Sequence, residues 1–174
     1  MKIQSYMVNI IALLILFLLS SCSIDNSSQE VSSFQLDEIT ISDLQQAYKN
    51  GDYSIRQVVQ LYVDRIDEID QNGPGLNSVI IINPDALSIA DSLDKELAEG
   101  VSYGPMHGIP VLLKDNIDTH DKMPTTAGSR VLKDSYPLQD SFVAQKLREA
   151  GAVILGKANL SEWANYRGSF SSSG

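Results

Sequence analysis

The chain has 174 residues, of which 43% are hydrophobic and 20% charged, values that are ordinary for one globular domain. Its formal net charge of -9 argues against a nucleic-acid partner, because a nucleic-acid-binding surface needs a basic patch. The single cysteine excludes an intrachain disulfide and any multi-cysteine metal site, and with only two histidines a zinc site is not expected.

The first residues predict a lipoprotein signal peptide. Lys2 is the only charged residue before Asp25, and residues 10–19 form an unbroken apolar run. This run is short for a membrane-spanning helix and is typical of the apolar region of a signal peptide. It ends in Leu-Ser-Ser-Cys, which matches a bacterial lipobox whose cysteine is acylated. We therefore expect residues 1–21 to be removed and Cys22 to anchor an exported protein to the cell envelope; an uncleaved signal anchor is the alternative.

Residues 22–38 are rich in Ser, Asn, Gln and Asp and predict a polar tether, after which the folded domain, residues 39–174, begins. Thr40 or Ser42 can cap a short helix that Gly51 ends. The spacing Ser54-x-x-Gln57 predicts a capping box at the start of a second helix, which ends before Gly73.

Three apolar runs predict strands at residues 77–82, 109–113 and 152–155. Helices are predicted from Pro84 to about Gly100, from a cap at Asp140 to Gly151, and from residue 161 onward. Alternating strands and helices indicate an α/β domain with a largely parallel or mixed sheet that helices cover.

Lys114 ends the second predicted strand and is the main candidate for chemistry. An ammonium loses solvation at the end of a buried strand, which lowers the pKa of a lysine toward the neutral amine. A neutral amine can accept a proton from a serine hydroxyl. The alternative is a lysine whose side chain extends to solvent. Asp115 follows on an extended segment and is expected to point to the opposite face, where it orders the next loop.

Three ordered blocks surround this lysine: Gly-Pro-Met-His-Gly-Ile-Pro-Val-Leu-Leu-Lys-Asp at 104–115, Thr-Thr-Ala-Gly-Ser at 125–129, and Gly-Ala-Val-Ile-Leu-Gly-Lys-Ala-Asn-Leu-Ser-Glu at 151–162. They resemble the amidase signature family, over roughly residues 40–174. Met106 stands where the family usually has leucine, a volume-conserving change. The resemblance implies the family's α/β/α fold, with a central mixed sheet covered by helices, and amide hydrolysis without a metal or organic cofactor.

The resemblance also implies a Ser–cis-Ser–Lys catalytic triad in which Lys114 is the lysine. The family's two catalytic serines lie several tens of residues further on, so we expect them beyond Gly174 and expect this N-terminal portion to be inactive alone. The closing Ser-Ser-Ser-Gly follows the third block closely, so we do not expect it to be the serine-rich catalytic stretch; the alternative is that Ser172 or Ser173 is the bridging serine. The predicted substrate-side residues are Thr126, Gly128, Ser129, Ser172 and Ser173.

Three functions fit these patterns. An exported, lipid-anchored amidase would act on a peptide amide or small amide, which the lipobox and the peptide-amidase-like segment 159–169 favour. The glutaminase-type subunit of a glutamyl-tRNA(Gln) amidotransferase shares the same blocks, but export argues against it because charged tRNA is cytoplasmic. A non-catalytic lipoprotein could use the fold only to bind a ligand. The sequence leaves the substrate and the oligomeric state open.

Overall fold

The computed structural model describes residues 35–165, and the chain divides into two units between Glu38 and Ile39. Of the first unit only residues 35–38 are described, and they form a turn. The second unit carries all of the helices and strands below. The predicted signal peptide, Cys22, Ser172 and Ser173 lie outside the described residues.

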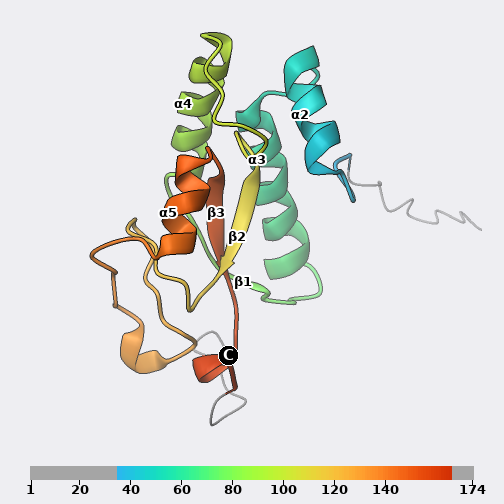
Figure 1. Cartoon of the computed structure of the whole chain (residues 1–174). Coiled ribbons are helices and arrows are strands. Elements are labelled where there is room, and N and C mark those ends of the chain that lie inside the picture. Colours follow the sequence, from blue (N-terminus) through green and yellow to red (C-terminus); the bar gives the residue numbers. More distant parts are fainter. Residues whose placement is uncertain (1–34, 166–174) are drawn as a thin grey trace, which may run out of the picture. The chain divides into compact units, whose positions relative to one another are not determined.

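Helices and strands alternate along the second unit (Figure 1). In chain order the elements are α2 (Ile41–Asn50), α3 (Ile55–Arg65), a π-helical turn (Ile66–Gln71), β1 (Val79–Ile82), α4 (Ala86–Ala98), β2 (Pro110–Lys114), a 3-10 turn (Arg130–Leu132), α5 (Phe142–Glu149), β3 (Val153–Ala158) and a 3-10 turn (Glu162–Asn165). Among the described residues, no helix is long and apolar enough to cross a membrane.

The three strands form one mixed sheet in the order β1-β3-β2. The central strand β3 runs antiparallel to β1 and parallel to β2. Helix α5 packs on one face of the sheet, where Ala144 joins a buried cluster with Leu113, Met123 and Ile154. Helices α3 and α4 pack against each other and both contact β3, and in Figure 1 the strands lie between α5 and α3. This confirms the predicted α/β fold with a mixed sheet.

The local signals for the first two helices are confirmed. Thr40 caps α2 by accepting a hydrogen bond from the Asp43 N–H, and Gly51 ends the helix in the left-handed conformation. At α3, the Ser54 side chain accepts from the Gln57 N–H while the Gln57 side chain accepts from the Ser54 N–H, which is a complete capping box.

Two boundaries differ from prediction. Helix α5 is capped by Ser141 rather than by Asp140. The Asp140 carboxylate instead accepts hydrogen bonds from the His120 N–H at 2.7 Å and from the Arg148 side chain at 3.0 Å. The helix expected from residue 161 is a single turn, because the backbone of Trp163 and Ala164 is left-handed, with φ of 50° and 54°.

The end of the second helix holds a feature that the sequence did not predict, a π-helical turn that buries Asp70. The Asp70 carboxylate accepts hydrogen bonds from the Ser78 N–H, the Val79 N–H and the Ser78 hydroxyl, which fixes the start of β1. Burial by itself raises the pKa of Asp70, but these three hydrogen bonds together hold it below its usual value.

Tyr48 joins α2 to the turn before β2. Its hydroxyl donates to the Gly108 carbonyl at 2.9 Å, and the ring is buried. Burial raises the pKa of the Tyr48 phenol well above its ordinary value, and the nearby Asp94 carboxylate and Tyr62 add to the effect. The folded protein therefore retains this proton at a pH where the unfolded chain releases it.

We expect Tyr48→Phe to lower the free energy of unfolding at neutral pH by about 1 kcal/mol, because a buried hydrogen bond is lost. Since the folded-state pKa lies above the ordinary 10.0, the wild-type protein loses stability as pH rises above 10, and the variant lacks this loss. Urea unfolding from pH 7 to 11 should show the difference shrinking. Leu44→Ala, one turn away, removes packing but no ionisable group, so its deficit should stay constant. A Tyr48→Phe deficit that also stays constant would contradict the prediction.

Candidate active site

Lys114 is the last residue of β2, which lies at an edge of the described three-stranded sheet. Side chains alternate along a strand, so Lys114 shares a face with Leu112, which is 40% exposed. Lys114 is also exposed, and among residues 35–165 its ammonium has no hydrogen bond or ion pair. The expected loss of solvation is therefore absent here, because no described element covers this face at the end of β2.

The backbone around Lys114 is firmly held. The Lys114 carbonyl accepts from the Ile117 N–H at 2.9 Å, which closes a turn directly after the strand. The Asp115 N–H donates to the Ala158 carbonyl at 3.0 Å, and the Asp115 carbonyl accepts from the Ala127 N–H at 2.8 Å. A proton acceptor must be held close to the hydroxyl that reacts with it. Lys114 has an anchored backbone and a side chain that no described residue binds, which fits this requirement.

Asp115 confirms the expectation that it orders the following loop. Its side chain is fully buried and accepts hydrogen bonds from the Thr126 N–H at 3.3 Å and from the Thr126 hydroxyl. It forms no ion pair with Lys114, since the two side chains leave the strand on opposite faces. Asp115 thus joins the first of the three sequence blocks to the second.

Lys157 on β3 is the buried lysine of the site. Its exposed fraction is 0%, and its ammonium donates to the Ile117 carbonyl at 2.7 Å and to the Thr125 hydroxyl at 2.9 Å. Burial lowers the pKa of Lys157 below the ordinary lysine value, although the negative charge of Asp115 opposes this. Lys157 joins the third sequence block to the loop between the first two.

The predicted substrate-side residues Thr126, Gly128 and Ser129 lie together and are buried. The Ser129 hydroxyl donates to Glu162 Oε1 at 2.7 Å, and the Trp163 N–H donates to the Ala127 carbonyl at 2.8 Å. Gly128 is left-handed and lies against the backbone of residues 160–162. These groups are used in contacts within the domain, and their place beside a substrate stays a prediction, as does that of Ser172 and Ser173.

The structure therefore brings Lys114, Asp115 and Thr126–Ser129 together at the carboxyl end of β2. Lys157 belongs to the third sequence block, but no role was predicted for it. The sequence pattern that could have indicated Lys157 is the one that indicated Lys114, namely a lysine that follows an apolar run. In the described part of the chain, no three His, Cys, Asp or Glu side chains are grouped as metal ligands.

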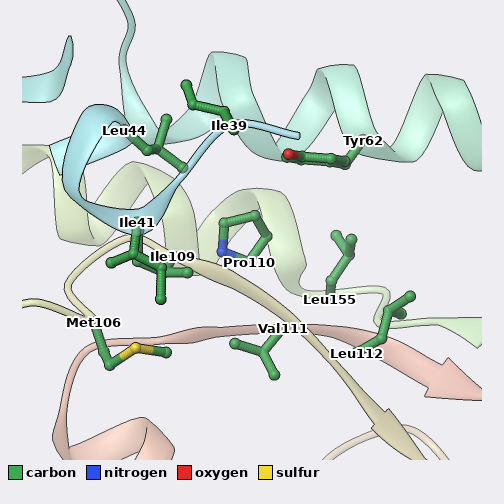
Figure 2. A pocket seen from close by; sticks show the side chains of 10 residues that line it. All are labelled: Ile39, Ile41, Leu44, Tyr62, Met106, Ile109, Pro110, Val111, Leu112 and Leu155. Carbon is green, nitrogen blue, oxygen red and sulfur yellow. The ribbon is translucent and has the colours of Figure 1, made fainter. Parts of the chain in front are cut away.

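An apolar groove of about 460 Å³ is lined by side chains of β2, including Leu112, and of helices α2 and α3 (Figure 2). Figure 2 shows aliphatic side chains on most of its wall, with the Tyr62 ring contributed by α3. Its lining residues are Ile39, Ile41, Leu44, Tyr62, Met106, Ile109, Pro110, Val111, Leu112 and Leu155. Lys114 and Lys157 are not among them, so the groove is mainly apolar surface and contains neither lysine.

Residues 57–173 match the family model described as Amidase. The chain belongs to the amidase signature family. Its fold matches the peptide amidase of Stenotrophomonas maltophilia with a TM-score of 0.75 and 46% identity, over 79% of this chain and 28% of that one. It also matches an amidase family protein of Bacillus anthracis with a TM-score of 0.72 and 44% identity, over 76% of this chain and 26% of that one.

Among curated relatives, a glutamyl-tRNA(Gln) amidotransferase subunit of Prochlorococcus marinus is 41% identical over 72% of this chain and 25% of its own length. The chain thus spans about a quarter of the length of the amidases and amidotransferase subunits that it matches. The family resemblance carried by the three sequence blocks is confirmed.

Proposed function

We propose that the complete protein hydrolyses carbon–nitrogen amide bonds by acyl transfer, with Lys114 as the proton acceptor of a Ser–Ser–Lys triad. The observation that carries this proposal is the position of Lys114 in an amidase family domain, on an anchored backbone with an ammonium that no described residue engages. The two serines come from the family resemblance and would lie outside this chain.

In the proposed reaction, neutral Lys114 accepts a proton from the bridging serine, which in turn takes the proton of the nucleophilic serine. That serine attacks the amide carbonyl, and backbone N–H groups stabilise the oxyanion. The proton then passes to the leaving amine, and water hydrolyses the acyl-enzyme. This chemistry needs a neutral lysine, so we propose that the complete protein covers the Leu112 face at the end of β2 and thereby desolvates Lys114.

For the substrate we propose a peptide amide or a small amide. Support comes from the 46% identity to a peptide amidase, which has also been solved with the competitive inhibitor chymostatin. Glutamine is the second candidate, because the matching glutamyl-tRNA(Gln) amidotransferase subunit is 41% identical. The predicted export favours the first, since charged tRNA is cytoplasmic.

Ammonia release by the complete protein distinguishes these functions. A C-terminally amidated peptide, a small aliphatic amide and glutamine would be supplied at equal concentration, and we expect turnover of the peptide amide or the small amide. Turnover of glutamine alone would favour the amidotransferase-like activity. Release from none of the three, with the folded protein confirmed by circular dichroism, would favour the non-catalytic lipoprotein.

We also propose that residues 1–21 direct export and that Cys22 carries the lipid anchor, which the apolar run 10–19 and the lipobox support. We expect Cys22→Ser to abolish incorporation of radiolabelled palmitate and to move the protein from the membrane to the soluble fraction. Ser21→Ala, which keeps the cysteine and a small residue before it, serves as the control. Label retained in Cys22→Ser would contradict the proposal.

A further inference from the structure

The buried ammonium of Lys157 is a group that the proposed reaction does not use. It lies closed off from solvent among the described residues, at the end of the central strand, and donates only to groups of the loop that follows β2. We propose that Lys157 is a positioning residue for Lys114, which it holds in place through the turn at residues 114–117. This inference rests on the proposed function of Lys114.

The sheet register places the two lysines on opposite faces. Lys157 pairs with Leu113 and Ile154 pairs with Val111, and paired residues in neighbouring strands share a face. The register shifts between these pairs, so a bulge brings Ile154 and Lys157 onto the same side of β3. Lys157 therefore faces the buried cluster under α5, whereas Lys114 leaves β2 on the other face.

A short path of hydrogen bonds joins them. The Lys157 ammonium holds the Ile117 carbonyl at 2.7 Å, and the Ile117 N–H holds the Lys114 carbonyl at 2.9 Å. The second donor of the ammonium fixes the Thr125 hydroxyl at 2.9 Å, beside Thr126, which binds Asp115. The turn after Lys114 is thus tied on one side to β3 and on the other to the loop at 125–127.

A hydrophobic side chain would fill this place at no desolvation cost, whereas a buried charge is stable only when its hydrogen bonds are satisfied. Unlike a hydrocarbon chain, the ammonium forms directional hydrogen bonds. These bonds hold two oxygen acceptors from different segments at fixed positions. Misplacement of a reacting group by about 1 Å can lower turnover by about 100-fold. The effect of losing this ammonium should therefore appear in kcat rather than in substrate binding.

The test uses the complete protein with an amide that it turns over. Lys157→Met keeps an unbranched apolar chain and removes only the terminal ammonium, and Thr125→Val removes one acceptor while conserving shape. We expect Lys157→Met to lower kcat by about 100-fold with KM within about twofold, and Thr125→Val to lower kcat in the same way by about 5-fold. Lys122→Met, an exposed lysine that pairs with Asp85, is the matched control and should keep wild-type kcat.

Hydrogen exchange supplies the readout that general destabilisation would not reproduce. We expect faster exchange at the amides of Asp115, Ile117 and Ala127 in both variants, with α4 protected as in the wild type. Unchanged kcat in a folded Lys157→Met, or faster exchange throughout the domain with kcat and KM changing together, would overturn the inference. If Lys157→Met does not fold, the same kcat and hydrogen-exchange measurements on Thr125→Val test the positioning role.

The two proposals fail in different ways. If Lys114→Ala retains full turnover, the proposed function of Lys114 is wrong, and the positioning role falls with it. If Lys114→Ala loses turnover while Lys157→Met and Thr125→Val retain it, only the positioning role is wrong.

Discussion

Lys114→Ala should lower amide hydrolysis by the complete protein by about 10²- to 10⁴-fold, the usual contribution of a positioned acid–base group. The fold should be unaffected, because the Lys114 side chain is exposed and makes no hydrogen bond or ion pair within residues 35–165. The backbone contacts of this residue do not depend on its side chain, so they remain in the variant. Steady-state kinetics give kcat and KM, and circular dichroism tests the fold.

Lys133→Ala is the matched control, since the Lys133 side chain is 73% exposed and follows the 3-10 turn Arg130–Leu132, outside β2. It should retain wild-type kinetics. Added methylammonium should partly restore turnover in Lys114→Ala if the missing function is proton transfer, and it should not affect the control. A Lys114→Ala protein with wild-type kcat would remove Lys114 from the mechanism.

Most of the helix predictions rested on capping residues and other short-range sequence patterns. Thr40 and the Ser54–Gln57 capping box are read from a few neighbouring residues, and the structure contains both caps. The cap of α5 was missed for a tertiary reason. Asp140 and Ser141 are adjacent and both are suitable caps, but Arg148 and the His120 N–H bind the Asp140 carboxylate, which leaves Ser141 to cap the helix.

The apolar pattern of a strand does not determine which of its lysines is buried in the folded protein. Lys114 ends β2 and Lys157 lies one residue before the end of β3, so the rule that a lysine at the end of an apolar strand loses solvation applies to both. The structure has the first exposed and the second buried. The difference comes from the bulge in the pairing of β2 and β3, which turns Lys157 toward the core under α5. A register shift depends on partners far along the chain, so the sequence alone could not predict which lysine is buried.

Gly128→Ala should lower the free energy of unfolding by about 3 kcal/mol, because both the backbone conformation and the neighbouring backbone oppose an added methyl group. Gly128 has a φ of 72°, which costs about 1 kcal/mol for a residue with a side chain. A Cβ here would also lie 2.7 Å from the Leu160 carbonyl oxygen and 3.0 Å from the Glu162 nitrogen, both of them backbone atoms. The rest of the loss comes from this overlap. Urea unfolding of the complete protein measures the total loss.

Gly75→Ala isolates the contribution of the overlap. Gly75 has nearly the same φ, 71°, but a Cβ there meets nothing within 4 Å, so the loss should be only about 1 kcal/mol. The difference between the two variants measures how closely residues 128 and 160–162 approach. Because the Ala127 N–H holds the Asp115 carbonyl next to Lys114, separating these segments should also lower turnover in Gly128→Ala and leave it unchanged in Gly75→Ala. Equal losses in the two variants would mean that the close contact between residue 128 and residues 160–162 does not exist in solution.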